Sequence, residues 1–239
     1  LTAALGEKAF DDLLAAIKSD RPQVRAVARN LAVGLPGETM TRRWIEQLKN
    51  ATPEVRAEIL ALLASRRDKS AVPAILAAIR ETDATVRMAA IQAAELAESE
   101  AIAPLLEIIE NGSDSEQAAA RSVLVKLGGT EADAKLAIAF KGASLKIRNG
   151  LLVVLAARGA RAQLGLFLAA LKDTDESLRI EGINGVGALG ELRQVPFLIE
   201  LLKTATSRGE QQVLDNALAS ICTAEPDKAR SAAPLLNLV

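Results

Sequence analysis

A two-residue pattern returns along the chain at nearly constant spacing. An aliphatic residue is followed by Arg at the start of a stretch rich in Ala and Leu, and the copies are Val24-Arg25, Val55-Arg56, Val86-Arg87, Ile147-Arg148 and Leu178-Arg179. Successive copies lie 31, 31, 61 and 31 residues apart, so the long step is two periods with one residue deleted. A fixed period of this length indicates an array in which each repeat is one small structural unit.

Two further copies of the pattern are degenerate. The copy missing from the long step should lie near Gln117-Ala118, where an Ala-rich helix is predicted but the Arg is absent at Ala118. A seventh copy lies around residues 211–221. We expect the loss of Arg at Ala118 to mark either a weak point or a change of curvature in the array.

Each period is predicted to contain two helices. In the third period, residues 71–80 place Val72, Ile75 and Ile79 at helical spacing, and residues 82–85 supply turn and N-cap chemistry. A second helix follows over residues 86–97. Proline opens several first helices, and its missing N–H has no intrahelical partner in the first turn. These prolines are Pro73, Pro104, Pro196 and Pro234.

The whole chain is therefore predicted to be all-α, a single repeat domain over residues 1–239. Half of its residues are hydrophobic but only 2% are aromatic, and such small aliphatic side chains suit closely packed helices. Seven helical hairpins and a partial eighth are expected, with bounds 7–36, 37–67, 68–98, 99–128, 129–159, 160–190, 191–224 and 225–239. Because the chain begins at Leu1 and ends within a repeat, we expect it to be a piece of a longer protein.

The period, the proline in the first helix and the Val-Arg opening of the second resemble the HEAT repeat superfamily. The short bacterial, phycobilisome-lyase-like repeats are particularly similar. The resemblance covers about residues 10–239 and implies a right-handed α-α superhelix, also called a solenoid. It also implies a structural ladder in which an arginine bonds an acid or carbonyl of an adjacent turn. Its members would be Arg25, Arg56, Arg87, Arg148 and Arg179.

Composition disfavours several classes of function. The sequence contains no histidine, which removes Ser-His-Asp catalysis, His-ligated zinc and the metal motifs of the HEAT-type deoxyhypusine hydroxylases. The formal net charge is −1, so nucleic acid is a poor candidate partner. No apolar run approaches a membrane span. We expect no enzyme activity, cofactor or metal, and the chain carries no targeting signal that separates a cytoplasmic from a periplasmic location.

Several local motifs are better explained by structure than by chemistry. The acidic groups at Asp11-Asp12 and Asp173–Glu176 fit helix starts. Gly185-x-Gly187-x-x-Gly190 formally matches a dinucleotide fingerprint, yet it lies inside a predicted helix. Trp44 and Cys222 are expected in the core. The basic clusters at residues 42–43 and 66–69 are short and lack interleaved aromatics.

A partner surface is expected on the second helices, which line the concave side of a HEAT solenoid. Its mixture of amides and both charge signs suits a protein or peptide partner. The candidate residues are Arg29, Asn30, Glu58, Gln92, Glu95, Arg121, Asn149, Glu181, Asn184 and Asn216. The leading hypothesis is a non-catalytic interaction or scaffold module. The alternatives are an accessory domain fused to an enzyme, or a bilin- or protein-binding factor like the phycobilisome lyases.

Overall fold

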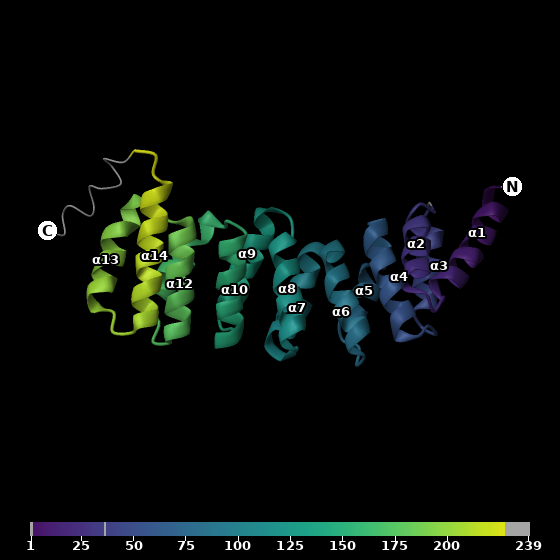
Figure 1. Cartoon of the computed structure of the whole chain (residues 1–239), viewed down its shortest axis with the longest axis horizontal. Coiled ribbons are helices and arrows are strands. Elements are labelled where there is room, and N and C mark those ends of the chain that lie inside the picture. The colour runs from purple at the N-terminus through teal and green to yellow at the C-terminus, as the bar shows by residue number, and fades with distance from the viewer. Residues whose placement is uncertain (1, 36, 228–239) are drawn as a thin grey trace. The chain divides into compact units, whose positions relative to one another are not determined.

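The computed structural model describes residues 2–35 and 37–227, and these residues form helices and turns without any strand. Two compact units are present: the first ends at Leu127 and the second begins at Gly128 (Figure 1). The prediction of an all-α repeat fold is confirmed. The right-handed sense, the single repeat domain and the repeat bounds stay predictions, and the partial eighth repeat around Pro234 lies outside the described residues.

The first unit is built from paired antiparallel helices. In each pair a first helix, sometimes preceded by a short 3-10 turn, packs on a second helix. The elements are α1 (Thr2–Ile17), α2 (Pro22–Val33), α3 (Glu38–Gln47), α4 (Pro53–Arg66), η1 (Lys69–Ala71), α5 (Val72–Ala78), α6 (Ala84–Ala93), η2 (Ala94–Ala101), α7 (Ile102–Asn111) and α8 (Asp114–Lys126).

The second unit repeats the same arrangement. Its elements are α9 (Gly129–Phe140), α10 (Leu145–Ala157), η3 (Arg161–Gln163), α11 (Leu164–Ala170), α12 (Glu176–Leu189), η4 (Leu192–Gln194), α13 (Val195–Thr204) and α14 (Arg208–Ala224). Within each unit the second helices stack on one another, α2 on α4, α4 on α6 and α6 on α8, then α10 on α12 and α12 on α14.

The helix starts follow from local chemistry. Pro22 and Pro53 occupy the first turns of α2 and α4. Ser113 caps α8, and Asp83 and Asp175 cap α6 and α12, each by accepting a backbone N–H that has no intrahelical partner. The core between the helix layers is aliphatic, as the composition predicts, and includes Leu60, Ile91 and Leu152 among its fully buried residues. No helix among the described residues is long and apolar enough to cross a membrane.

Candidate interaction surface on the second helices

The recurrent arginines link successive hairpins of the first unit. Arg56 of α4 pairs with the Glu81 side chain in the next hairpin's turn. The Glu81 carbonyl in turn accepts a hydrogen bond from Arg87 Nη1 at 2.9 Å. Arg87 Nε then donates to Glu116 of α8 at 2.9 Å. One turn residue thus binds the arginine before it through its side chain and the arginine after it through its backbone.

Glu116 is the best-enclosed acid of this ladder. Burial alone would raise its pKa, but the hydrogen bonds from the Ser113 backbone and hydroxyl and from Arg87 outweigh that effect, so the pKa lies below the usual glutamate value. Its side chain is only 5% exposed, and it completes a capping box with Ser113 at the start of α8. Glu116 therefore ties the ladder to a helix start while remaining ionised.

The second unit repeats this ladder. Arg148 Nη1 donates to Asp173 Oδ2 at 3.1 Å, and the Asp173 carbonyl accepts from Arg179 Nη1 at 3.0 Å. Arg179 Nε donates to Glu210 of α14 at 2.8 Å, a bond that raises the pKa of Arg179. The Asp175 backbone N–H donates to the Asp173 carboxylate, which Arg148 also binds. These interactions outweigh desolvation and hold the pKa of the Asp173 carboxyl below its usual value.

The first rung keeps the equivalent turn carbonyl but pairs with an acid that lies within the next second helix, α4. Arg25 Nη1 donates to the Ser19 carbonyl at 2.9 Å, and its Nε lies 3.6 Å from Glu58 Oε1. Arg29 Nη1 donates to the other Glu58 oxygen at 2.9 Å. Arg29 and Glu58, two of the candidate partner residues, therefore pair with each other between α2 and α4.

Glutamine ends the ladder in each unit. Gln117 Nε2 donates to the Gly112 carbonyl at 2.7 Å, and Gln211 Nε2 donates to the Ala205 carbonyl at 2.8 Å. These are the turn carbonyls that the arginines bind in other hairpins. The residue that takes the place of the missing arginine is therefore Gln117, one position before Ala118. A neutral amide keeps the carbonyl contact but cannot form the ion pair.

The chain also contains a longer repeat, about three times the 31-residue period, which was not predicted from the sequence. We call residues 37–127 the first block and residues 128–224 the second block. Arg56, Arg66 and Arg87 have arginine equivalents 92 residues later at 148, 158 and 179. Backbone conformation follows the same offset: Gly37 and Gly129 have φ of 96° and 78°. Comparing sequence segments three repeats apart would have revealed this relation.

Arg66 and Arg158 form a second arginine system at the other end of their hairpins. Arg66 Nη1 donates to the Ala32 carbonyl at 3.1 Å and also to Leu35, while Nη2 donates to Gly37 at 3.0 Å. Arg158 donates to the Gly129 carbonyl at 3.1 Å and pairs with Asp133. Burial lowers the pKa of Arg66. The basic cluster at residues 66–69 is thus partly a clamp on the loop before α3.

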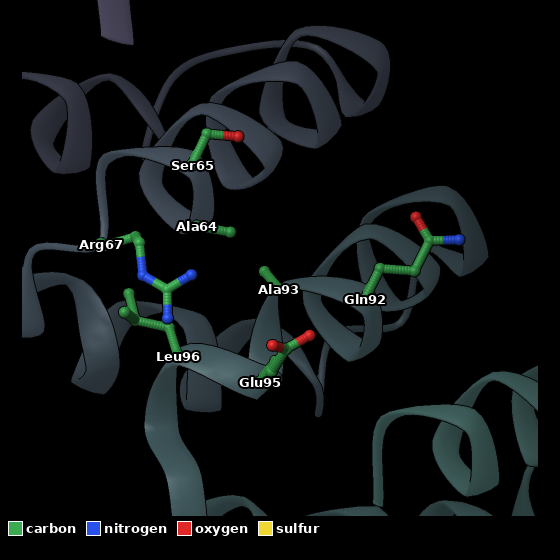
Figure 2. A pocket seen from close by; sticks show the side chains of 7 residues that line it. All are labelled: Ala64, Ser65, Arg67, Gln92, Ala93, Glu95 and Leu96. Carbon is green, nitrogen blue, oxygen red and sulfur yellow. The ribbon is translucent and has the colours of Figure 1, made fainter. Parts of the chain in front are cut away.

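Arg67, the next residue of that cluster, lies at an open depression between α4 and η2, in the first unit (Figure 2). Its volume is about 220 Å³. Residues from the end of α4 line one side and residues from α6 and η2 line the other, namely Ala64, Ser65, Arg67, Gln92, Ala93, Glu95 and Leu96. We call this the 64–96 depression. Gln92 and Glu95 belong to the partner surface that the sequence predicts. Arg67 does not belong to that predicted surface, because the sequence indicates it only as a member of the basic cluster at residues 66–69.

Arg67 has an unusual backbone conformation. Its φ is 54° and its ψ is 26°, in the left-handed region, which costs an L-residue with a side chain roughly 1–2 kcal/mol. The equivalent residue of the second block is Gly159, with φ of 68°, where that cost is absent. Among the described residues, Arg67, Gln92 and Glu95 form no side-chain hydrogen bond or ion pair. The first block therefore holds a free guanidinium at a position where glycine is the less strained choice.

The other candidate residues are dispersed over the two units. Asn149 Nδ2 donates to Ser177 at 2.8 Å, Asn184 Nδ2 donates to Glu181 at 3.4 Å, and Asn216 accepts from Gln212 at 3.3 Å. Asn30 is exposed on α2 and Arg121 is half-buried on α8. Gln92 and Glu95 line a common hollow, so the candidate site is taken around these two residues and is narrower than the predicted surface.

Gly185 and Gly187 of the glycine-rich motif lie within the helix α12, and Gly190 is its C-cap residue. A Cβ on Gly185 would overlap the ring of Phe167, and one on Gly187 would lie 2.8 Å from the Ala217 Cα. These glycines allow close helix packing, which accounts for their spacing without a bound nucleotide. No cluster of three possible metal-binding side chains occurs in the described part of the chain.

Trp44 is fully buried, as expected for a core residue. Its ring centroid lies 4.4 Å from that of Phe10, and the Arg43 guanidinium lies 3.8 Å from the Phe10 centroid while pairing with Asp11. Cys222 is half-buried and has a free thiol. None of these residues contributes to the 64–96 depression.

Residues 41–125 match the family model described as HEAT repeats. This part of the chain carries HEAT repeats. That match runs from α3 into α8 and so includes the 64–96 depression. The search of curated proteins gave no match.

Three solved structures are similar to this chain. Human deoxyhypusine hydroxylase is 18% identical over 92% of this chain and 98% of its own, with a TM-score of 0.39. The CpcE–CpcF complex of phycocyanin lyase from a Nostoc species is 16% identical over 95% and 93%, with a TM-score of 0.43. The Escherichia coli protein YibA is 16% identical over 99% and 96%, with a TM-score of 0.47. At these values the likenesses carry no functional argument.

Proposed function

We propose that this HEAT-repeat array is a non-catalytic scaffold that binds a protein or peptide segment at the 64–96 depression. The observation that carries the proposal is Arg67: a guanidinium without a partner in the described structure is held at the rim by a left-handed backbone conformation. Strained residues of this kind cluster at binding sites. A scaffold fits the sequence, which contains no histidine for acid–base or nucleophilic chemistry.

The chemistry of the depression defines the kind of segment it would bind. Arg67 would form a charge-assisted pair with a carboxylate of the partner. Gln92 offers both an amide donor and an acceptor, which match a peptide backbone. Leu96, Ala64 and Ala93 provide an apolar floor for a short side chain. An acidic peptide with one small apolar residue beside the acid fits these features better than a phosphate backbone, given the net charge of −1.

A displayed peptide library tests this proposal. Selection against the whole chain should enrich peptides that contain Asp or Glu, and their binding should be lost with the triple variant Arg67→Ala, Gln92→Ala, Glu95→Ala. The matched control changes the same residue types on α3, as Arg42→Ala, Glu46→Ala, Gln47→Ala, and should retain binding. Circular dichroism establishes that both variants are folded. Enriched peptides that bind the first triple variant as well as the parent would contradict the proposal.

A further inference from the structure

Two rungs of the ladder share one spacing between the arginine and its acid. Arg56 pairs with Glu81, which lies 25 residues later, in the turn between the two helices of the next hairpin. Arg148 of the second unit pairs with Asp173, which also lies 25 residues later in such a turn. Each carboxylate thus reaches back across the boundary between two hairpins. An acid 25 residues after a ladder arginine is therefore one way in which this fold satisfies the guanidinium.

Arg25 has no acid at this spacing. The residue 25 positions after it is Asn50, an exposed amide in the turn between α3 and α4. Arg25 keeps its hydrogen bond to the Ser19 carbonyl, but the carboxylate of Glu58 lies 3.6 Å from its Nε, beyond hydrogen-bond distance. That carboxylate also accepts a hydrogen bond from Arg29 at 2.9 Å. Among the five ladder arginines, Arg25 is therefore the one without a hydrogen-bonded acid.

An open hollow of about 500 Å³ lies beside this incomplete rung. Arg25 and Asn50 both line it, and its walls are the turns before α2 and α4, in two adjoining complete hairpins. Lys18 is a second cation in the lining. Its side chain is exposed and forms no hydrogen bond or ion pair with the described residues. The first rung thus has an accessible space and two basic groups where two other rungs have a turn acid.

We propose that this hollow binds a carboxylate group from outside the chain. The carboxylate would take the position that a turn acid holds beside other ladder arginines, and it would form charge-assisted hydrogen bonds with Arg25. Lys18 would add a second positive charge, and Asn50 an amide donor. Glu58 would then pair with Arg29 alone. The bound group completes the first rung with ligand atoms in place of a protein side chain.

Acidic side chains at the hollow limit what else the ligand can carry. Asp20 and Glu54 also line it, and both are exposed, whereas the Arg25 side chain is only 18% exposed. A second negative charge on the ligand, as in phosphate or succinate, would be repelled by these two carboxylates. The ligand is therefore a single carboxylate on an otherwise uncharged body. A Glu or Asp side chain of a peptide and a small monocarboxylic acid share this chemistry.

The hollow is separate from the 64–96 depression. It lies at the start of α4, whereas the depression lies at the end of that helix. The helix has 14 residues, so about 20 Å of helix separates the two. The inference does not rest on the proposed function. The triple variant Arg67→Ala, Gln92→Ala, Glu95→Ala should bind carboxylates at the hollow as the parent does, so failure of one proposal is distinguishable from failure of the other.

NMR of the Arg25 side chain tests the proposal in the full chain. Arginines are labelled with ¹⁵N, and the Arg25 Nε–H signal is identified as the one absent from Arg25→Lys. Acetate and acetyl-glutamate amide should each shift this signal to saturation, whereas chloride and acetamide should not. Succinate and phosphate should bind roughly threefold or more weakly. Tighter binding of the capped glutamate than of acetate would assign the site to a peptide side chain, and equal or weaker binding to a small acid.

Asn50→Glu and Asn50→Gln are the matched pair of variants. The first supplies a carboxylate 25 residues after Arg25, as Glu81 lies after Arg56, so acetate affinity should fall by about tenfold or more. The second has the same size without the charge and should bind as the parent does. Thermal unfolding establishes that both are folded. Equal acetate affinity in the two variants, or no saturable shift in the parent, would overturn the proposal, and a shift that chloride reproduces would mean an adventitious ion only.

Discussion

The two blocks solve one packing problem with different residues. In the second block Phe167 of α11 packs against Gly185 of α12. The residues 92 positions earlier, in the first block, are Ile75 of α5 and Ala93 of α6. The larger ring of Phe167 occupies the space that the Cβ of residue 185 would need. Side-chain volume has moved from one helix to the other while both positions remain buried. The fold therefore fixes the total volume of the layer and leaves its division open.

The blocks also differ in what they expose. The ladders are nearly the same, but the αL position after the second helix holds Arg67 in the first block and Gly159 in the second. The ladder that links successive hairpins is thus kept in both blocks. The residue that differs between the blocks, Arg67 in place of glycine, lies at the rim of the 64–96 depression. Function in this array is expected to follow from such differences between equivalent positions and not from the shared residues.

The largest expected effect is on the ladder. Arg87→Ala should lower the free energy of unfolding by about 3 kcal/mol, because it leaves the enclosed Glu116 without its charged partner. Urea unfolding measures this loss. Arg179→Ala, whose partner Glu210 is more exposed, should cost less. Equal losses in the two variants would show that burial of the acid does not set the strength of the rung.

The exchange of volume between the blocks is tested by a double-mutant cycle. Gly185→Ala alone should destabilise the chain by about 2 kcal/mol, because the added methyl overlaps the Phe167 ring. Adding Phe167→Ile recreates the pair of the first block and should restore most of that loss. Thermal unfolding of both single variants and the double variant gives the coupling. Additive losses would refute the compensation.

The ionisation of Glu116 predicts a pH dependence. Because the pKa of Glu116 is lowered in the folded chain, its contribution is present above the unfolded pKa and is lost as the pH falls through the folded value. Glu116→Gln should therefore cost about 1.5 kcal/mol at pH 7 and less at pH 3. Urea unfolding at the two pH values measures the difference. A loss that is the same at both would mean that the charge contributes nothing.

The smallest effects are at the αL position. Gly159→Arg should destabilise the second block by about 1 kcal/mol, whereas Arg67→Gly should be neutral or stabilise the first by less than that. Thermal unfolding gives both values. If residue 67 serves binding, the Gly variant should also lose the peptides selected by the parent. If Arg67→Gly is more stable than the parent and still binds the same peptides, the left-handed conformation of residue 67 has no role in binding.

The sequence predicts most of the framework and little of the site. The 31-residue period and the prolines indicate paired helices, because each repeat of this length is one small unit that buries its apolar face against the next repeat. Glu81 and Asp173 could not be assigned as ladder partners, since Asp83 lies beside the one and Asp175 and Glu176 beside the other, and only folded geometry selects one acid. Arg67 was hidden for another reason: a left-handed residue after a helix is usually glycine, so arginine gives no signal of that conformation.

The neutral glutamines at the ends of the ladders bear on how such a protein can change in length. Each ladder starts at an arginine, passes through turn acids, and finishes at Gln117 or Gln211, which bind only a backbone carbonyl. Because Glu58 of α4 pairs with Arg25 and Arg29 of α2, a deletion that begins at the first block would leave both arginines without their acid. A deletion inside a block would likewise separate Arg56 from Glu81 or Arg148 from Asp173. The ion pairs of the ladder therefore limit where hairpins can be removed, whereas a helix that carries glutamine at the ladder position sets no such limit through that residue.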